Sequence, residues 1–249
     1  MSKVKTDVAN EPIWARPEPA GRAPRFTREQ IATAALRIAD TEGFEAVTMK
    51  RIAAEVGAAT MTLYYYVRNK ADIVALMHDA ILADQLVSGE ELSSGWRPAT
   101  AAIARRTRAV LLAHPWSPAA LTDATFGPNA LRHMEQNLAA LADTQLIRNE
   151  KFALIAAIDA YVLGASLHAI ESLTRAAIAT SDPDAAAAAV EYGMRLLGSG
   201  EFPHLNAVND QPADADSAGP PLTDDALAEQ FERGLAALLD GLAAQLKLD

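Results

Sequence analysis

Apolar side chains recur every three or four residues along most of the chain, the spacing of one face of an α-helix. Between Thr27 and Gly43 that face includes Ile31 and Ile38. Thr27, with Gln30 three residues later, forms the capping-box pattern that starts a helix. Gly43 follows the last apolar position, where a glycine usually ends a helix. A first helix is therefore predicted between these two residues.

Two short helices follow in the pattern. Thr48 is a good N-cap for the second helix, and Gly57 ends it after about two turns. Thr60 is predicted to cap a third helix that points Leu63 inward, and Asn69 is predicted to cap a fourth. Two short helices joined by a tight turn are typical of a helix-turn-helix. A generic corner between two helices would show the same apolar spacing.

The rest of the chain reads as a larger helical body. Proline-rich residues 1–24 are predicted to be a disordered tail, and residues 206–221 a disordered loop. The expected fold is all-α, with a three-helix helix-turn-helix domain over residues 25–70 and a larger domain over residues 71–249. Long helices are predicted over residues 97–113, 128–143, 150–179, 184–197 and 223–247.

Composition narrows the class of protein. Half of the 249 residues are hydrophobic and none is cysteine, so disulfide and thiolate chemistry are excluded. The N-terminus lacks the apolar run of a signal peptide, and no uninterrupted apolar run reaches the length of a membrane span. We therefore expect a cytoplasmic protein without a membrane partner.

Charge is distributed unevenly along the chain. Residues 1–70 hold 11 Lys and Arg against 8 Asp and Glu, a balance of +3. The remaining residues hold 11 basic and 24 acidic side chains, a balance of −13, and the two sum to the net charge of −10. A basic head on an acidic body suits a DNA-binding protein. Charge alone does not separate this interpretation from two ordinary surfaces.

The stretch T-M-T-L-Y-Y-Y-V-R-N-K at residues 60–70 carries the chemistry of DNA recognition. If Leu63 is buried, its neighbours cannot all be buried with it. Thr and Met contact base edges in the major groove, while Tyr combines a flat ring with a hydroxyl that reaches phosphate. The alternative is that the three rings pack in a core. The predicted DNA contacts are Lys50, Arg51, Thr60, Met61, Thr62, Tyr64, Tyr65 and Lys70, with Arg22 and Arg25 as weaker candidates.

These residues carry a resemblance to a known family. Residues 26–82, with F-T-R-E-Q-I-A-T-A-A-L-R and T-L-Y-Y-Y-V-R-N-K, resemble the DNA-binding domain of the TetR family of bacterial regulators. The remainder resembles the tetracycline-repressor branch, in Trp96, R-R-T-R-A-V-L-L-A-H and the terminal F-E-R-G-L-A-A-L-L-D-G-L. The resemblance implies that the third helix enters the major groove. Met61 and Tyr66 differ from that branch, which has proline and histidine there, so a different operator is expected.

The resemblance also implies partners. Members of the family bind inverted-repeat operators as homodimers, and a small-molecule effector in the body releases the DNA. The predicted helices over residues 150–179 and 223–247 are the candidates for the dimer seam, a four-helix bundle formed by two copies. Burial of the same helices within one chain is the alternative. Repression is favoured over activation, although an activator would share these features.

The aligned effector positions argue against magnesium-tetracycline. Leu121 stands where the branch has its magnesium-binding histidine, and His168 where it has a metal-linked glutamate. The positions of drug contacts hold Thr107, Ala124 and Asn137. Magnesium prefers oxygen ligands, which these metal positions do not supply. No metal and no cofactor is therefore predicted. The candidate lining of the effector pocket is Trp116, Phe126, Asn137, His168 and Glu171, each of which also fits an ordinary core or surface position.

Other function classes have weaker support. The sequence has no nucleophile-elbow, zinc-protease or phosphate-loop motif, so an enzyme with a vestigial DNA-binding head is the runner-up. His168 and Glu171 are its candidate acid–base pair, although any helix can hold such a pair. A helical interaction module without DNA binding is the third class. Turnover of a compound would support the enzyme, and salt-dependent affinity for duplex DNA would exclude the module.

Overall fold

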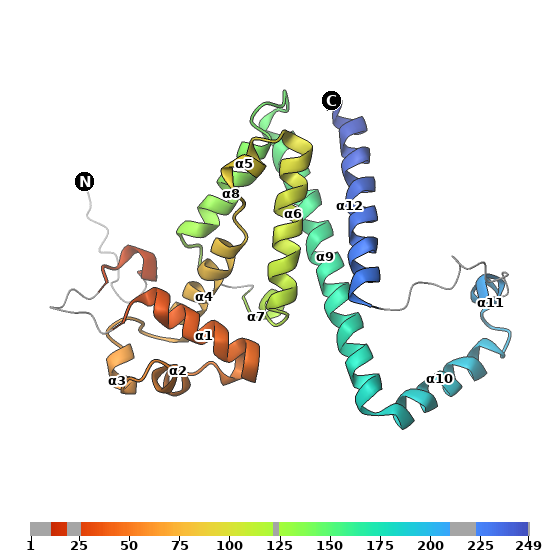
Figure 1. Cartoon of the computed structure of the whole chain (residues 1–249), viewed down its shortest axis with the longest axis horizontal. Helices are drawn as coiled ribbons and strands as arrows, with labels where there is room; N and C mark the ends of the chain where they lie inside the picture. Colours follow the sequence, from red (N-terminus) through yellow and green to blue (C-terminus); the bar gives the residue numbers. More distant parts are fainter. Residues whose placement is uncertain (1–10, 19–25, 122–124, 210–222, 249) are drawn as a thin grey trace, which may run out of the picture. The chain divides into compact units, whose positions relative to one another are not determined.

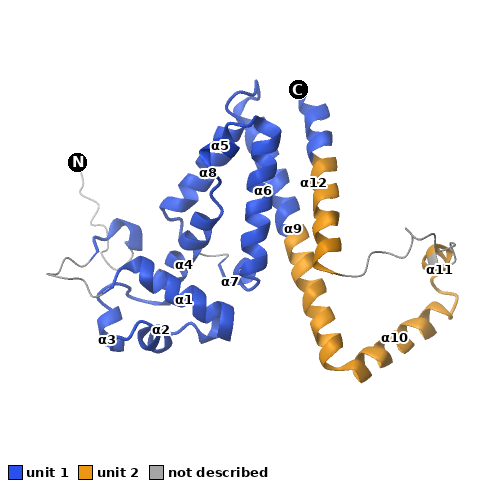
Figure 2. Ribbon diagram, in the orientation of Figure 1, with its two compact units in different colours: residues 1–163, 239–249 blue, residues 164–238 orange. Residues whose placement is uncertain are grey.

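The computed structural model describes residues 11–18, 26–121, 125–209 and 223–248, and every regular element in these ranges is a helix (Figure 1). This confirms the predicted all-α fold class. The chain divides into two compact units (Figure 2), unit 1 with residues 1–163 and 239–249 and unit 2 with residues 164–238. The elements are η2 (Ile13–Ala15), α1 (Arg28–Glu42), η3 (Phe44–Ala46), α2 (Met49–Glu55), α3 (Thr60–Leu63), α4 (Lys70–Asp84), α5 (Gly89–Leu92), α6 (Trp96–Ala113), α7 (Ser117–Ala120), α8 (Pro128–Ala140), α9 (Arg148–Ser181), α10 (Pro183–Leu197), α11 (Pro203–Asn209) and α12 (Asp224–Leu246).

Three of the four predicted helix caps are present. The side chains of Thr27, Thr48 and Asn69 each accept a hydrogen bond from the backbone N–H three residues later, over 3.1, 3.2 and 2.9 Å. The prediction for Thr60 is wrong. The N-cap of α3 is Ala59, which has no side-chain cap, because the chain becomes helical one residue earlier than expected.

Helices α1 to α4 share one hydrophobic core. Ile31 of α1, Ile52 of α2, Leu63 of α3 and Met77 of α4 are completely buried in it. The predicted domain boundary at residue 70 lies at the start of α4, yet α4 packs against α1 and contributes to this core. The three-helix head therefore depends on a fourth helix for its packing.

The turn of the helix-turn-helix is set by Gly57. This residue has a φ of +68°, a conformation that favours glycine. The N–H of Ala58 donates to the carbonyl of Ala53 over 2.8 Å, and the N–H of Gly57 donates to that of Ala54 over 3.3 Å. This pair of bonds is a Schellman motif, which satisfies the last carbonyls of α2 and turns the chain into α3.

The predicted disordered tail is wrong for residues 11–18, which form a strap across the head, here called the N-terminal strap. Ile13 is only 2% exposed within the core of α1 to α4. The buried guanidinium of Arg28 donates to the carbonyls of Ile13 and Arg16, both over 2.9 Å, and Arg16 pairs with Asp72 of α4. Side chains of the head thus accept or donate the hydrogen bonds that a short segment with only one 3-10 turn, η2, cannot form by itself.

The predicted loop at residues 206–221 is wrong at its start. Residues 206–209 belong to α11, and residues 210–221 lie outside the described ranges, as do residues 1–10 and the candidates Arg22 and Arg25. Each of the five long helices begins and ends within three residues of its predicted bounds. Short α5 begins after Ser88, which forms a capping box with Glu91.

Unit 2 leaves much apolar surface uncovered. Leu227, Phe231 and Leu235 bury one face of α12, whereas Leu167 and Ile178 of α9 are 38% and 62% exposed. Helix α9 is also long and apolar enough to cross a membrane by length and composition, with one third of its most apolar window buried. The absence of a long uninterrupted apolar run led us to expect no membrane helix. The hydropathy of α9 does not by itself exclude one.

Candidate functional site

Helix α3 and the turn after it present a row of exposed side chains. Met61, Tyr64 and Tyr65 are 72%, 46% and 77% exposed, whereas Leu63 and Tyr66 are buried. The alternative in which all three tyrosines pack in a core is therefore wrong, since only Tyr66 does so. Leaving large apolar and aromatic side chains in water is unfavourable, and neighbouring exposed ones commonly mark an interaction site. This row is therefore a candidate contact surface.

The buried side of this segment is held firmly. Tyr66 packs edge-to-face on Phe26, with ring centroids 6.4 Å apart, and Val67 is completely buried. The threonines that flank Met61, Thr60 and Thr62, are half-buried. The head thus fixes the direction in which the exposed row points.

Two predicted cations lie beside this surface. Lys50, in the first turn of α2, is exposed. Lys70 begins α4, and its Nζ lies 4.8 Å from the centre of the Phe44 ring, a cation–π contact that leaves the side chain exposed. Both ammonium groups are exposed, and their contact with phosphate stays a prediction.

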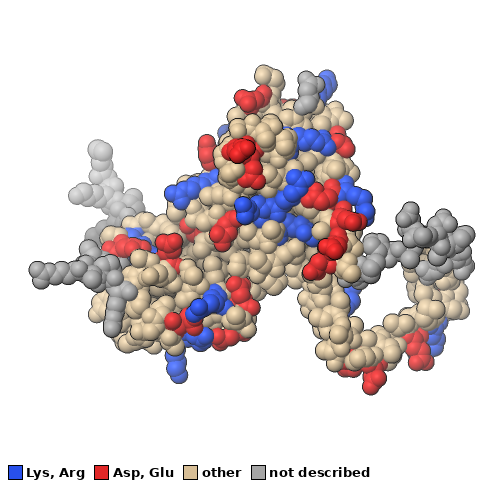
Figure 3. Space-filling view, viewed as in Figure 1, with Lys and Arg blue, Asp and Glu red and all other residues tan. Residues whose placement is uncertain are grey.

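Arg51 is occupied within the head. Its guanidinium pairs with Glu42 at 2.6 Å and with Glu55 at 2.7 Å, and Arg37 also pairs with Glu55. Figure 3 shows basic and acidic side chains intermingled over α1 and α2, in agreement with this pairing. The i, i+4 spacing of Arg51 and Glu55 was a visible signal for one of these bonds. Arg51 is therefore engaged structurally, and its contact with DNA stays a prediction.

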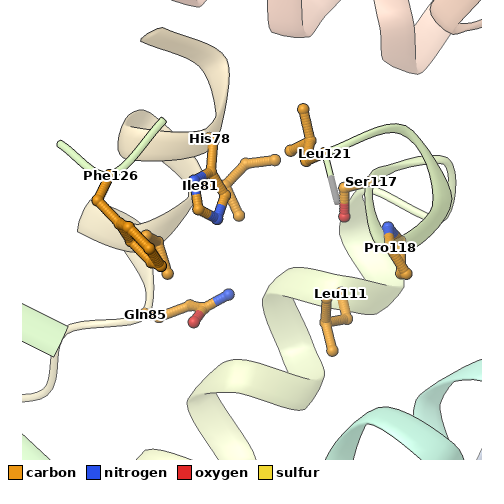
Figure 4. A pocket seen from close by; sticks show the side chains of 9 residues that line it. His78, Ile81, Gln85, Leu111, Ser117, Pro118, Leu121 and Phe126 are labelled. Carbon is orange, nitrogen blue, oxygen red and sulfur yellow. The ribbon is translucent and has the colours of Figure 1, made fainter. Parts of the chain in front are cut away.

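A cavity of about 310 Å³ lies within unit 1, and we call it the α4–α7 pocket. Its polar side chains face each other across the cavity, with His78 and Gln85 on one side and Ser117 on the other (Figure 4). Apolar side chains from α4, α6 and α7 complete the wall. The lining residues are His78, Ile81, Leu82, Gln85, Leu111, Ser117, Pro118, Leu121 and Phe126.

Only one predicted pocket residue, Phe126, lines this cavity. The side chain of Asn137 instead donates to the carbonyl of His133 over 2.8 Å on its own helix. His168 and Glu171 are exposed on α9 and are not among the lining residues. Sequence reasoning missed His78, which lies on α4 between the buried residues Met77 and Ile81.

Trp116 connects the pocket wall to the head instead of lining the pocket. Its Nε1–H donates to Asp40 of α1 over 2.8 Å, and its ring stacks on Phe44 with centroids 5.5 Å apart. His114 Nδ1 lies 2.7 Å from the same Asp40 carboxylate. Ser117, the next residue, lines the pocket. A displacement of residues 114–117 would therefore directly change the hydrogen bonds to Asp40 of α1.

Metal-binding groups do not gather in the parts of the chain that the structure describes, where no three His, Cys, Asp or Glu side chains cluster. Leu121, at the position aligned with the magnesium-binding histidine, is 7% exposed and contributes an apolar side chain to the pocket wall. Ala124, another aligned position, lies outside the described residues. The pocket therefore offers a ligand hydrogen bonds and apolar contact.

Two histidines beside the pocket have perturbed proton affinity. Burial lowers the pKa of His78, an effect that the neighbouring Asp79 carboxylate partly offsets. Burial also lowers the pKa of His133 on α8, and the charge of His78 lowers it further. Burial raises the pKa of Asp79, while its hydrogen bonds from Asn129 oppose this. Both imidazoles are consequently neutral at pH 7.

Acid should destabilise the protein through these histidines. A histidine whose pKa is lower in the folded state binds its proton more readily when unfolded, so stability falls as pH drops from about 6.5 through the folded pKa. We expect the His133→Gln variant to lose less melting temperature than the parent between pH 7.5 and 5.5, measured by circular dichroism. Exposed His204→Gln is the matched control. Equal losses in His133→Gln and the parent would contradict the assignment.

Comparison with known proteins matches both halves of the chain. The family model "Bacterial regulatory proteins, tetR family" matches residues 31–77, and the model "Tetracyclin repressor-like, C-terminal domain" matches residues 89–246. The transcriptional repressor DrrR1 of Streptomyces coeruleorubidus is 32% identical, over 95% of this chain and 86% of its own length. A transcriptional regulator of Saccharopolyspora erythraea is 35% identical, over 67% and 74% of the two chains.

Solved structures share the fold. ActR of Streptomyces coelicolor, crystallised in complex with (S)-DNPA, has a TM-score of 0.63 and 25% identity, and the match covers 90% of this chain and 99% of ActR. A possible TetR family regulator from the same species has a TM-score of 0.62 and covers 87% and 98%. The second family model spans more than half of the chain, and one relative exceeds 30% identity over nearly all of it. The chain therefore belongs to the TetR family of bacterial transcriptional regulators.

Proposed function

We propose that this regulator is a repressor that binds an inverted-repeat operator as a homodimer and leaves it when a small molecule fills the α4–α7 pocket. The observation that carries the proposal is the exposed row of Met61, Tyr64 and Tyr65 on a helix-turn-helix whose other face is buried. DrrR1 is named a repressor, and ActR is solved with a bound small molecule. We place its action in the cytoplasm, where the DNA is.

In the proposed complex α3 lies in the major groove. Met61 and the flanking threonines would contact base edges and thymine methyls, while the hydroxyls of Tyr64 and Tyr65 would reach phosphates. Lys50 and Lys70 would add phosphate contacts, and the N-terminus of α4 favours the same charge. Arg51 would contribute mainly by holding α2 in place. Because Arg16, Arg37 and Arg51 in the described part of the head pair with carboxylates, we infer that sequence reading depends on the exposed neutral side chains.

The second copy is proposed to cover the apolar faces of α9 and α12. Leu163 and Leu167 of α9 are 44% and 38% exposed, more than a solvated helix needs. A Cβ placed on Gly164 or Gly241 would meet no atom within 4 Å, so packing within this chain does not account for these glycines. The close approach of a helix from a second copy would account for them. If a second copy covers this face of α9, the high hydropathy of the helix needs no membrane to account for it.

We propose that two elements lining or adjoining the pocket transmit the effect of ligand binding to the DNA-binding head. His78 and Ile81 belong to α4, which begins directly after the DNA-reading segment. Ser117 follows Trp116, whose ring contacts Asp40 and Phe44 in the head. A ligand that displaces either wall would tilt the head. Because paired half-sites lie about 34 Å apart on DNA, a small change in the separation of two heads lowers affinity.

The enzyme alternative has little support in the pocket. Ser117 and His78 face the same cavity, but Ser117 Oγ and His78 Nδ1 are both buried without a hydrogen-bond partner. A serine nucleophile needs a base within hydrogen-bond reach to activate it. The family relatives are regulators as well. Turnover of a bound compound would be evidence for the enzyme alternative.

The test of the proposed function is selection of random duplex DNA by the full-length protein. We expect enrichment of an inverted repeat and affinity that falls with salt. Lys50→Ala should weaken binding to every selected sequence and reduce the salt slope by about 1 per subunit contact. Exposed Lys247→Ala is the matched control. No enriched sequence, together with no affinity for duplex at low salt, would overturn the proposal.

A further inference from the structure

The N-terminal strap and the segment that carries the two exposed tyrosines share a buried partner. We call residues 64–68, which follow α3, the tyrosine turn. Asp72 of α4 is 9% exposed and pairs with Arg16 of the strap, and its second oxygen accepts the backbone N–H of Arg68 over 2.7 Å. One buried carboxylate therefore holds both the strap and the end of the tyrosine turn.

Arg28 of α1 is a second shared partner. Its buried guanidinium donates to the strap carbonyls of Ile13 and Arg16, both over 2.9 Å, and through Nε to the carbonyl of Tyr66 over 3.4 Å. A guanidinium carries N–H groups on all three nitrogens, and burial makes an acceptor for each of them necessary. The strap thus supplies acceptors for Arg28, and Arg28 in turn bonds the tyrosine turn.

The exposed tyrosines depend on this backbone for their direction. Leu63 and Val67 are completely buried on either side, while Tyr64 and Tyr65 project from the stretch between them. A hydrogen bond weakens steeply when its donor is misaligned. A displaced backbone would therefore weaken the proposed contacts of both hydroxyls with DNA, although neither side chain had changed.

The strap is also fixed at Trp14, next to the start of α8. A Cβ added to Gly127 would lie 2.7 Å from Cε2 of the Trp14 indole and would collide with the carboxylate of Asp79. Only glycine leaves room here for both groups. The Asp79 carboxylate accepts the N–H of Asn129 in the first turn of α8 over 2.8 Å. The strap is therefore seated against α8 by Trp14 and against α4 by Arg16.

We propose that the N-terminal strap is a positioning element for DNA recognition, which is seated by Trp14 and holds the tyrosine turn in place through Arg16 and Arg28. The strap acts through the backbone of the turn. Arg16 is only 8% exposed, too buried to contact a phosphate itself. The inference rests on the proposed function, in which Tyr64 and Tyr65 contact DNA, and it adds residues that act on this contact from behind.

The first test titrates full-length Arg16→Gln with the selected operator and with a non-specific duplex over a range of salt. We expect operator affinity to fall about 5- to 20-fold, while non-specific affinity and the salt slope stay as in the parent, because no phosphate contact is removed. A merely structural role would lower both affinities equally, by reducing the folded fraction. A direct phosphate contact of Arg16 would reduce the salt slope by about 1. Either result would overturn the inference.

The second test needs no DNA. Hydrogen exchange of residues 64–69, measured by mass spectrometry on the full-length protein, should be at least about 5-fold faster in Arg16→Gln and in Trp14→Ala, because the turn opens more often without its seated strap. Trp14→Phe should restore most of the protection. Parent-like exchange in either of the first two variants would overturn the inference, and if one of them does not fold, the other still decides.

Two substitutions outside the head are the matched controls. Arg97→Gln breaks the ion pair with Asp240 between α6 and α12, and Trp96→Ala removes a half-buried indole at the start of α6. Neither should change exchange in the tyrosine turn or the ratio of specific to non-specific affinity. Faster exchange of the turn in both controls would show that it responds to any destabilisation, and would overturn the assignment to the strap.

The positioning role and the proposed function fail in different ways. An operator that the parent and Arg16→Gln bind equally well would overturn the positioning role and leave the function standing. Conversely, a protein that enriches no DNA sequence would lose the proposed function and, with it, the role of the strap in recognition. Faster exchange in Arg16→Gln would then still show that the strap holds the turn.

Discussion

The Asp72→Ala variant should lose about 3–5 kcal/mol of unfolding free energy, the usual cost of removing one partner of a buried ion pair. Asp72 and Arg16 are 9% and 8% exposed, and they pair across the contact between the N-terminal strap and α4. The second oxygen of Asp72 accepts the backbone N–H of Arg68 over 2.7 Å. The substitution leaves the Arg16 guanidinium buried without its counter-charge.

The measurement is thermal and urea unfolding of the full-length protein. For a chain of this size the loss corresponds to a fall in melting temperature of roughly 6–20 °C. Asp84→Ala is the matched control, since Asp84 is an exposed aspartate at the far end of the same helix. The double variant Arg16→Met/Asp72→Ala should recover part of the loss, because an apolar side chain tolerates the buried site. An unchanged melting temperature in Asp72→Ala would show that the strap does not stabilise the head.

The Tyr65→Ala variant should lose operator affinity while keeping its fold. Tyr65 is 77% exposed, so its removal should change stability by no more than about 0.5 kcal/mol. A side chain that contacts DNA contributes about 1–3 kcal/mol, which corresponds to a roughly 5- to 150-fold loss of affinity. In a dimer both half-sites lose the contact, so the upper part of that range is expected.

The measurement is titration of the selected operator at fixed salt, with circular dichroism as the check on folding. Tyr192→Ala on α10 is the matched control, since Tyr192 is 55% exposed and lies outside the head. Tyr65→Phe separates the two roles of the side chain: retained affinity indicates ring contact, and lost affinity indicates the hydroxyl. Operator affinity equal to the parent in Tyr65→Ala would remove Tyr65 from the contact surface.

Local hydrogen bonds made most helix boundaries predictable. A capping threonine or asparagine acts on a backbone N–H only three residues away, so the starts of α1, α2 and α4 could be read from neighbours in sequence. The Schellman turn at Gly57 is equally local. Thr60 shows the limit of this reasoning, since a good capping residue does not cap when the helix begins before it.

The exposed face of α3 was also predictable, because burial of one helical position determines the direction of the others. Once Leu63 is inside, periodicity sends Met61 and Tyr65 outward and brings Tyr66 inward, as found. The pocket was much less predictable. Of the five candidates, chosen for aromatic or polar character, Phe126 alone lines it, because lining depends on how α4, α6 and α7 meet.

The sequence by itself determined the all-α class, the helix bounds, the helix-turn-helix and the family, since these depend on periodicity, caps and local motifs. Only the tertiary structure decided which charges are paired, which tail residues fold, and which side chains face the pocket. Arg16 and Asp72 lie 56 residues apart, and Trp116 and Asp40 lie 76 apart. No local pattern links such residues. Their contacts form because burying an apolar or charged side chain is favourable only where distant segments supply its partners.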